Sequence, residues 1–177
     1  VGSKGNKEFA ESMSEKSITL FRNDDCILPV KPGRIVSIST EPLSLTGADN
    51  VTPGKSKLSE ALRNILGGKA YTIPLDPDGG LIEKMVNICK PADTVIAGTY
   101  NASLNHGQAM LINKIYEANK KLIVVSLRNP YDILMFKRIP VYICAYEYTP
   151  LSISSVLKVI TGEIKAVGKL PIKLELH

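Results

Sequence analysis

The sequence predicts an α/β fold, a three-layer sandwich with a mostly parallel sheet of five or six strands and helices on both faces. Strand-like and helix-like segments alternate along the chain, which is typical of parallel strands joined by helices. Residues 122–127 are largely apolar and follow a lysine pair, as expected for a central strand buried on both faces. At 177 residues, the chain is long enough for one domain with a substantial core.

The N-terminal segment predicts a lead, a helix and a short strand. Residues 1–7 are rich in Gly, Ser, Asn and Lys, the composition of a flexible lead or linker, so the single domain is expected over residues 8–177. Phe9 and Met13 are four positions apart and would share one face of a helix over Glu8–Lys16. Ile18–Phe21 is short and strand-like.

A long polar connection separates the first main strand from the next helix. Arg34–Ser39 alternates in a way that suits a strand, and Glu41–Lys55 is polar and contains Gly and Pro. A helix is expected over Ser56–Leu66, ending at a Gly-Gly pair, because four apolar residues fall on one side. These residues are Leu58, Leu62, Ile65 and Leu66.

The remaining elements follow from the same patterns of apolar spacing. Thr149 is expected to cap a helix whose first residue is Pro150, and Gly162 is expected to end that helix. The predicted strands are Lys69–Ile73, Thr94–Gly98, Leu122–Leu127 and Val141–Ala145, with a last extended piece at Leu170–Leu174. The predicted helices are Leu81–Cys89, Met110–Asn119 and Pro150–Thr161, and a short element is expected over Tyr131–Phe136.

The composition excludes several classes of protein. The net charge is +5, but the 22 Lys and Arg residues are scattered rather than gathered in a stripe, so we expect a solvated surface and no nucleic-acid partner. No apolar stretch is long enough to span a membrane. Cys26, Cys89 and Cys144 are odd in number and far apart, which indicates neither a disulfide framework nor a metal site. Cys144 lies in an apolar run and is expected to be buried.

Nucleotide-binding and hydrolase motifs are incomplete or absent, and no cofactor is predicted. Pro53–Ser56 resembles the end of a phosphate-binding P-loop, but the motif needs a glycine where Asp49 stands. There is no Gly-x-Gly-x-x-Gly fingerprint and no Gly-x-Ser-x-Gly nucleophile elbow.

Polar side chains follow the predicted central strand at the point where it ends. Arg128, Asn129 and Asp132 share a sharp turn, because Pro130 keeps the preceding residue out of the helical region. Ligands of open α/β sheets gather at the carboxyl ends of strands, so one interpretation is ligand binding. On the other interpretation, Asn and Asp only satisfy the backbone of the turn, and Arg128 is solvated.

Two further residues stand out by their chemistry. His106 is the only plausible catalytic or ligand-contacting imidazole, because His177 is the last residue, although a lone loop histidine is also typical of a solvated helix start. Glu147 is the best-placed carboxylate, but glycoside hydrolysis usually needs a pair. The candidate substrate-binding residues are therefore Asn101, His106, Gln108, Arg128, Asp132 and Glu147.

Several motifs in register resemble the C-terminal domain of family 3 glycoside hydrolases. The resemblance covers nearly everything from Phe9 to Ile172. It is carried by Glu15–Asp24 (EKSITLFRND) with Ile27-Leu28-Pro29 behind it, Ala92–Ile96 (ADTVI), Arg128–Asp132 (RNPYD), Gly162-Glu163 and Gly168–Ile172 (GKLPI).

This resemblance implies that the chain is the second domain of a larger enzyme. In the family, the α/β sandwich follows a catalytic (β/α)8 barrel that carries the aspartate nucleophile, and such a barrel needs roughly 250 residues. The β-glucosidases of the family place a general-acid glutamate in a long acidic insertion after the strand corresponding to Thr94–Gly98. Here that loop is short and contains no carboxylate, which resembles the β-N-acetylglucosaminidase branch, where an Asp-His pair in the barrel does the acid/base work.

The expected function is that of a non-catalytic domain that supports the barrel of the same parent chain and lines the outer substrate cleft. The parent would remove N-acetylglucosamine from cell-wall or chitin-derived glycans. It would be bacterial and extracellular or associated with the cell wall, with a cytoplasmic parent as the alternative. A free-standing carbohydrate-binding module, a β-glucosidase-type domain and a purely structural domain remain as alternatives.

Overall fold

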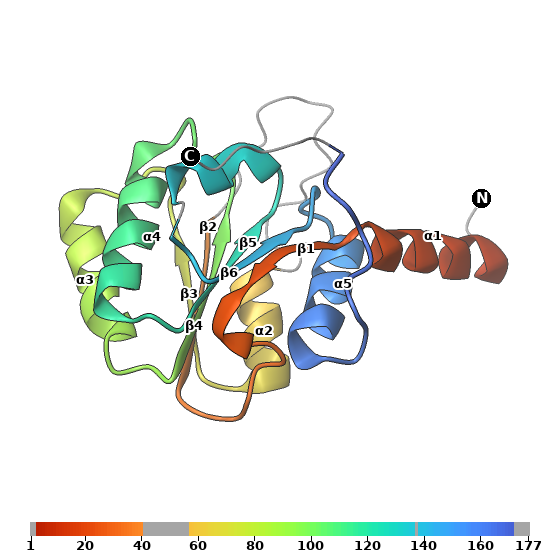
Figure 1. Cartoon of the computed structure of the whole chain (residues 1–177), viewed down its shortest axis with the longest axis horizontal. Coiled ribbons are helices and arrows are strands. Elements are labelled where there is room, and N and C mark those ends of the chain that lie inside the picture. The colour runs from red at the N-terminus through yellow and green to blue at the C-terminus, as the bar shows by residue number, and fades with distance from the viewer. Residues whose placement is uncertain (1–2, 41–56, 137, 172–177) are drawn as a thin grey trace.

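Six strands form one sheet in the order β1-β6-β5-β4-β2-β3 in the computed structural model, which describes residues 3–40, 57–136 and 138–171 (Figure 1). All neighbouring strands are parallel except β1, which pairs antiparallel with β6 at one edge. The strands are β1 (Thr19–Asn23), β2 (Ile35–Thr40), β3 (Lys69–Ile73), β4 (Thr94–Thr99), β5 (Leu122–Ser126) and β6 (Val141–Cys144). The mostly parallel sheet predicted from the sequence is confirmed.

Helices cover both faces of this sheet, which makes the predicted three-layer sandwich. Figure 1 shows α3 and α4 on one side of the sheet and α2 and α5 on the other. The α-helices are α1 (Lys4–Ser17), α2 (Leu58–Leu66), α3 (Gly79–Cys89), α4 (His106–Ala118) and α5 (Pro150–Thr161). Two short 3-10 helices, η1 (Asp24–Cys26) and η2 (Pro130–Met135), complete the described elements.

The central strand β5 supplies alternate residues to two separate cores. Val124 packs into the core beneath α3 and α4, whereas Ile123 and Val125 pack into the core beneath α2 and α5. All five residues of β5 are buried, because successive side chains of a strand point to opposite faces and both faces are covered. This burial confirms the position predicted for the strand. Cys144 of β6 is buried as predicted.

Local capping chemistry explains several helix boundaries. The Thr149 hydroxyl accepts a hydrogen bond from the Ser152 N–H, and Pro150 occupies the first turn of α5, as the sequence predicted. The helix ends at Gly162, whose φ of 80° is in the left-handed region that glycine adopts without strain. Asp78 caps α3 in the same way by accepting from the Leu81 N–H at 2.9 Å.

The structure differs from the sequence interpretation in several places. Helix α1 begins at Lys4 and so includes part of the segment expected to be a flexible lead, because the Ser3 hydroxyl caps it. Helix α4 begins at His106 rather than Met110. Ile65 was expected on the inner side of α2 but is 57% exposed, whereas Leu58 and Leu62 are buried in the core and Leu66 packs against it. The connection over residues 41–55, the Pro53–Ser56 motif and most of the last extended piece lie outside the described residues.

An ion pair fixes the edge of the sheet where β2 and β4 begin. Asp93 accepts hydrogen bonds from the Arg34 backbone N–H at 2.8 Å and from the Arg34 guanidinium at 3.1 and 3.3 Å. These hydrogen bonds lower the pKa of Asp93 from 3.8 to about 2.

Among the described residues, no helix is both long and apolar enough to cross a membrane.

Candidate functional site

The predicted site residues lie just beyond the carboxyl ends of β4, β5 and β6, either in the loops that follow these strands or in the first turn of α4. Strand pairing aligns Thr99 of β4 with Ser126 of β5, and Ser126 with Cys144 of β6, so the three strands end at one edge. Each connection that follows one of these three strands contains at least one of the six candidates. The structure therefore gathers them at a single edge of the sheet, although it divides them into buried and exposed groups.

Asp132 is fully buried beneath the loop that follows β4. Its carboxylate accepts one hydrogen bond from the Thr99 hydroxyl and another from the Ser103 backbone N–H, each at 3.2 Å. Burial raises the pKa of Asp132, and hydrogen bonds from Ala102, Ser103 and Thr99 offset part of that rise. The side chain thus connects the turn after β5 to the loop after β4.

Gln108 is also buried, in the first turns of α4, and three hydrogen bonds occupy its carboxamide. Its oxygen accepts from the Tyr100 backbone N–H at 2.9 Å. Its nitrogen donates to the carbonyls of Leu75 and Tyr100 at 2.7 and 3.0 Å. Gln108 therefore holds the start of the loop after β4 against the segment that follows β3, and its polar atoms are used inside the protein.

Arg128 and two tyrosines connect the loops that follow β4, β5 and β6. The Arg128 guanidinium donates a hydrogen bond to the Tyr100 hydroxyl at 2.5 Å and lies 5.5 Å from the centre of the Tyr100 ring. The Tyr100 ring in turn meets the Tyr148 ring edge-on, with their centres 6.4 Å apart. Arg128 is exposed, whereas Tyr100 is 2% exposed, so the guanidinium is positioned at the surface by a buried aromatic side chain.

The other three candidates are closer to solvent. His106 is exposed at the first residue of α4, and Glu147 is exposed and accepts a hydrogen bond from the Thr149 hydroxyl at 3.2 Å. Asn101 has a φ of 52°, and its carbonyl accepts hydrogen bonds from the backbone N–H groups of Leu104 and Asn105. Asn101 therefore shapes the turn of this loop. A substrate-binding role for the six residues remains a prediction.

The described loops after β3, β4, β5 and β6 contain one buried carboxylate, that of Asp132, and three exposed ones. The exposed carboxylates are those of Asp76, Asp78 and Glu147, and each accepts a hydrogen bond from a nearby backbone N–H or hydroxyl. A retaining glycosidase needs two carboxyl groups about 5–5.5 Å apart across the scissile bond. Asp132 is 0% exposed and its oxygens already accept internal hydrogen bonds. Nowhere in the described ranges do three or more His, Cys, Asp or Glu side chains converge as metal ligands would.

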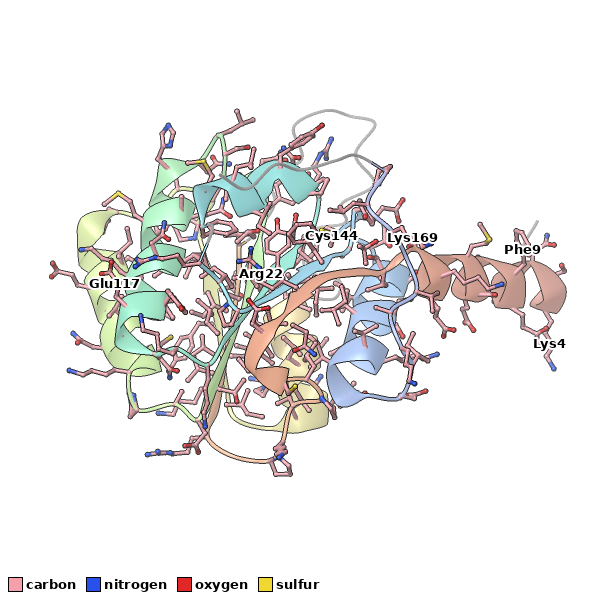
Figure 2. The ribbon with its side chains drawn as sticks, in the orientation of Figure 1. Lys4, Phe9, Arg22, Glu117, Cys144 and Lys169 are labelled. Carbon is pink, nitrogen blue, oxygen red and sulfur yellow. The ribbon has the colours of Figure 1, made fainter. Side chains whose placement is uncertain are left out.

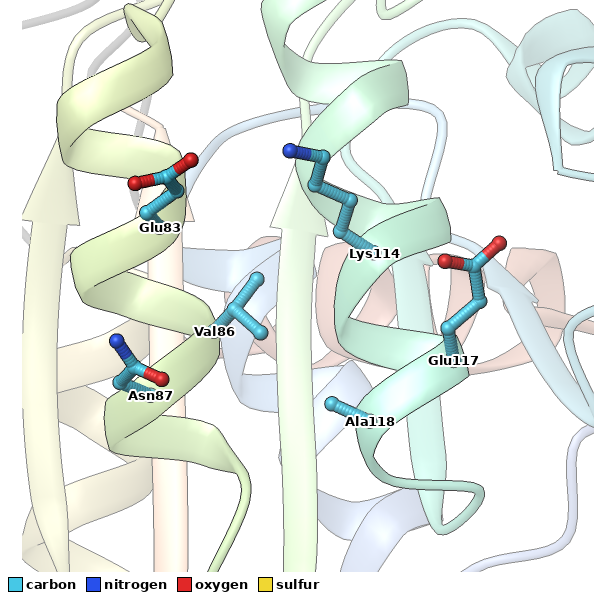
Figure 3. Close-up of a pocket in the computed structure, with 6 residues that line it drawn as sticks. All are labelled: Glu83, Val86, Asn87, Lys114, Glu117 and Ala118. Carbon is cyan, nitrogen blue, oxygen red and sulfur yellow. The ribbon is translucent and has the colours of Figure 1, made fainter.

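A shallow groove of about 510 Å³ lies elsewhere, between α3 and α4. Figure 3 shows Glu83, Val86 and Asn87 on α3 facing residues of α4 across this groove. The α4 residues that line it are Lys114, Glu117 and Ala118. The groove contains none of the six candidates, and it lies on an outer helical face rather than at the carboxyl ends of the strands.

The sequence interpretation did not include Tyr100 and Tyr148 among the site residues. Arg128 contacts Tyr100, and Tyr100 contacts Tyr148. Tyr100 directly follows β4. A large aromatic residue placed immediately after a buried strand was the available signal. Tyr148 carried a weaker signal, because it is one of two tyrosines that flank Glu147.

Comparisons with solved structures find several glycoside hydrolases of family 3. The chain matches a glycoside hydrolase family 3 β-N-acetylglucosaminidase from Paenibacillus sp. str. FPU-7 with a TM-score of 0.87, at 28% identity over 100% of this chain. It matches a fungal multi-domain β-N-acetylglucosaminidase of the same family with a TM-score of 0.79, at 25% identity over 98% of this chain. A family 3 β-glucosidase from Bifidobacterium adolescentis shares the fold at 21% identity, with a TM-score of 0.72 over 93% of this chain.

These enzymes are much longer than the chain itself. The chain spans 34% of the Paenibacillus enzyme, 20% of the fungal enzyme and 28% of the Bifidobacterium enzyme. No protein-family model matches the sequence, and no curated protein matches it either. The structural matches nevertheless agree with the motifs at Glu15–Asp24 and Arg128–Asp132. The chain therefore resembles one domain of these family 3 glycoside hydrolases.

Proposed function

We propose that the chain is the C-terminal, non-catalytic domain of an enzyme that removes β-linked N-acetylglucosamine from cell-wall or chitin-derived glycans. A (β/α)8 barrel in the same parent chain supplies the catalytic groups. The domain supports that barrel, and the edge of the sheet that carries Arg128 lines the outer part of the substrate cleft.

The observation that carries this proposal is the internal use of polar groups in the loop between Thr99 and His106. The loop contains no carboxylate. Its backbone N–H groups at Ser103 and Tyr100 donate hydrogen bonds to the side chains of Asp132 and Gln108, respectively. A general acid must present a proton to the leaving group. Asp132 is buried and accepts internal hydrogen bonds, so it is not placed to act as that acid. This arrangement favours a wall of the cleft over a source of acid catalysis.

The preference for N-acetylglucosamine is supported by two similarities. Two of the matched enzymes, at 28% and 25% identity, are described as β-N-acetylglucosaminidases. The loop after β4 is also short, and it lacks the acidic insertion that the β-glucosidases of the family have at this position.

Hydrolysis of two chromogenic substrates tests the proposal. The complete parent polypeptide and the isolated 177-residue chain are each assayed with an N-acetyl-β-glucosaminide and a β-glucoside. We expect the parent to cleave the N-acetylglucosaminide at least tenfold faster than the glucoside and the isolated chain to cleave neither. Activity of the isolated chain would overturn the non-catalytic role, and a preference of the parent for the glucoside would overturn the sugar assignment.

Substitution of Arg128 in the parent separates a cleft-lining domain from a purely structural one. Arg128→Ala should raise KM for a chitin oligosaccharide more than for the small chromogenic substrate, because only the longer glycan reaches the outer cleft. If Arg128→Ala leaves the KM values for both substrates unchanged and lowers the melting temperature, the domain only stabilises the barrel.

A free-standing carbohydrate-binding module is the second candidate function. It is favoured by the side chain of Tyr131, which is 45% exposed and lies three residues after Arg128 at the strand ends. Titration calorimetry of the isolated chain with N-acetylglucosamine and muropeptides distinguishes the two. Measurable affinity without the barrel would favour the module.

A further inference from the structure

We propose that the outward face of α1, formed by Phe9 and Met13, is the surface through which this domain docks onto the rest of its parent chain. This inference rests on the proposed function, since it requires the chain to be one domain of a larger enzyme. It does not depend on which sugar the enzyme cleaves.

Helix α1 is attached to its own domain through its last turn. The Ser14 hydroxyl forms a hydrogen bond with the Ser155 hydroxyl at 2.8 Å, and Glu15 accepts one from the Lys158 ammonium at 2.5 Å. Residues 3–11 are all exposed, and none of the residues of α1 is buried. Figure 1 shows the N-terminal half of α1 extending beyond α5, away from the sheet.

The apolar side chains of α1 lie on the face turned away from its attachment. Phe9 and Ser14 are five positions apart, and at about 3.6 residues per turn this places them on nearly opposite faces. Met13 follows Phe9 by four positions and shares its face. Phe9 is 68% and Met13 is 52% exposed, and Figure 2 shows Phe9 on the opposite side of α1 from Lys4.

A helix exposed in this way is marginal without a partner. Isolated helices shorter than about 12–15 residues are barely stable in water, and packing of an apolar face supplies most of the stability of helices in proteins. The described structure covers the Ser14 face of α1 and leaves the Phe9 face open. Burial of this second face would stabilise the helix along its whole length.

The remainder of the parent chain is the occupant that the comparisons favour. The match with the Paenibacillus enzyme covers 100% of this chain, α1 included, yet 66% of that enzyme lies outside the match, because the chain covers 34% of it. The same helix is thus aligned in a polypeptide that has a large additional body. In this proposal, that additional body covers Phe9 and Met13.

Paired substitutions in the parent and in the isolated chain test this docking surface. Phe9→Ser with Met13→Ser should lower the melting temperature of the parent by about 3 °C or more. It should also increase the rate of protease cleavage within residues 1–17 at least fivefold. In the isolated chain, the same change should leave the melting temperature within about 1 °C, because both side chains are already exposed.

Ile65→Ser is the matched control, since Ile65 is an exposed helical residue of similar apolarity in α2, at 57% exposure. It should leave the parent unchanged. A parent that tolerates the Phe9/Met13 change with unaltered melting and cleavage would overturn the inference. Sedimentation showing that the isolated chain dimerises through these residues would also overturn it, because the occupant would then be a second copy.

The substrate assay of the unaltered parent keeps this test separate from the proposed function. A parent that cleaves a different sugar but loses stability on the Phe9/Met13 change rejects the sugar assignment and retains the docking surface. A parent that cleaves N-acetylglucosaminides and keeps its stability after the Phe9/Met13 change retains the sugar assignment and rejects the docking surface.

Discussion

The carboxylate of Asp132, on the turn after β5, accepts a hydrogen bond from the hydroxyl of Thr99, the last residue of β4, at 3.2 Å. The two residues are 33 positions apart in the sequence, and the bond is buried. It joins the ends of two neighbouring parallel strands at the edge that carries the candidate site. The carboxyl group that the sequence offered as a ligand contact is therefore part of the framework that shapes the loop after β4.

Removal of this carboxylate should destabilise the domain. Asp132→Ala leaves the Thr99 hydroxyl and the Ser103 N–H without their buried acceptor, so we expect a loss of about 2–3 kcal/mol in the free energy of unfolding. Urea denaturation of the isolated chain measures this loss. Glu147→Ala, which removes an exposed carboxylate from the same edge, should change stability by less than about 0.5 kcal/mol. Equal effects of the two substitutions would contradict the structural role of Asp132.

Two aspartates should titrate on opposite sides of the ordinary aspartate pKa. Burial raises the pKa of Asp132 above 3.8, whereas hydrogen bonds from Arg34 lower the pKa of Asp93 to about 2. Carboxyl chemical shifts followed by NMR from pH 1.5 to 7 would report both values. Arg34→Gln should move the midpoint of Asp93 back toward 3.8 and leave Asp132 unaffected. A midpoint for Asp132 below that of Asp93 would contradict the assignment.

These shifts also fix the direction of pH effects on stability. The folded protein retains the proton of Asp132 to higher pH than the unfolded chain does, so this contribution is complete below pH 3.8 and is lost as pH rises through the folded pKa. Asp93 behaves oppositely, with a contribution present above pH 3.8 and lost as pH falls through about 2. Asp132→Asn should therefore gain stability relative to the unaltered protein as pH rises from 4 to 7. A constant difference over that range would exclude titration of Asp132.

Gln108 and His106 provide a second matched pair of substitutions. Gln108→Ala removes two buried hydrogen bonds to Tyr100 and one partly buried hydrogen bond to Leu75. We therefore expect a loss of about 2–3 kcal/mol in the free energy of unfolding and faster amide exchange at Tyr100. His106→Ala, two residues earlier and exposed, should stay within about 0.5 kcal/mol. Chemical denaturation and hydrogen exchange of the isolated chain measure both effects. Unchanged exchange at Tyr100 in the Gln108 variant would show that the loop is held by other contacts.

Gly168 lies too close to the end of α1 to tolerate a side chain. A Cβ at this position would lie 2.4 Å from the Ser17 carbonyl oxygen and 2.7 Å from that of Ile18, and neither backbone oxygen can move freely. Gly168→Ala should cost about 1–3 kcal/mol in thermal or urea denaturation. Gly79→Ala serves as the control, because no atom lies within 4 Å of a Cβ there. A neutral Gly168→Ala variant would mean that the tail does not pack against α1 as described.

The sheet could be predicted from the sequence because local pattern and tertiary environment agree there. Residues 122–127 are apolar on both faces since helices cover both faces, and Thr149, Pro150 and Gly162 mark α5 by local chemistry alone. Ile65 was misplaced because helical spacing does not reveal how wide the buried stripe of α2 is. The start of α1 was missed because its cap at Ser3 lies in a segment of loop-like composition.

The sequence predicts where the candidate site lies, but it does not predict which of its side chains are buried and which are exposed. Position at a strand end predicts which edge of the sheet a residue reaches. It does not reveal whether the side chain points inward, as Asp132 and Gln108 do, or outward, as Arg128 does. That direction depends on contacts between residues far apart in the chain, such as the one between Thr99 and Asp132.

The mass of the native protein tests the central claim most directly. An antibody raised against this chain would be used to purify the protein from its source cells, and its mass and hydrolytic activity would be measured together. We predict a species much heavier than 19.2 kDa that cleaves a chromogenic N-acetyl-β-glucosaminide. A native species of 19.2 kDa without such activity would contradict the account and favour a free-standing binding module.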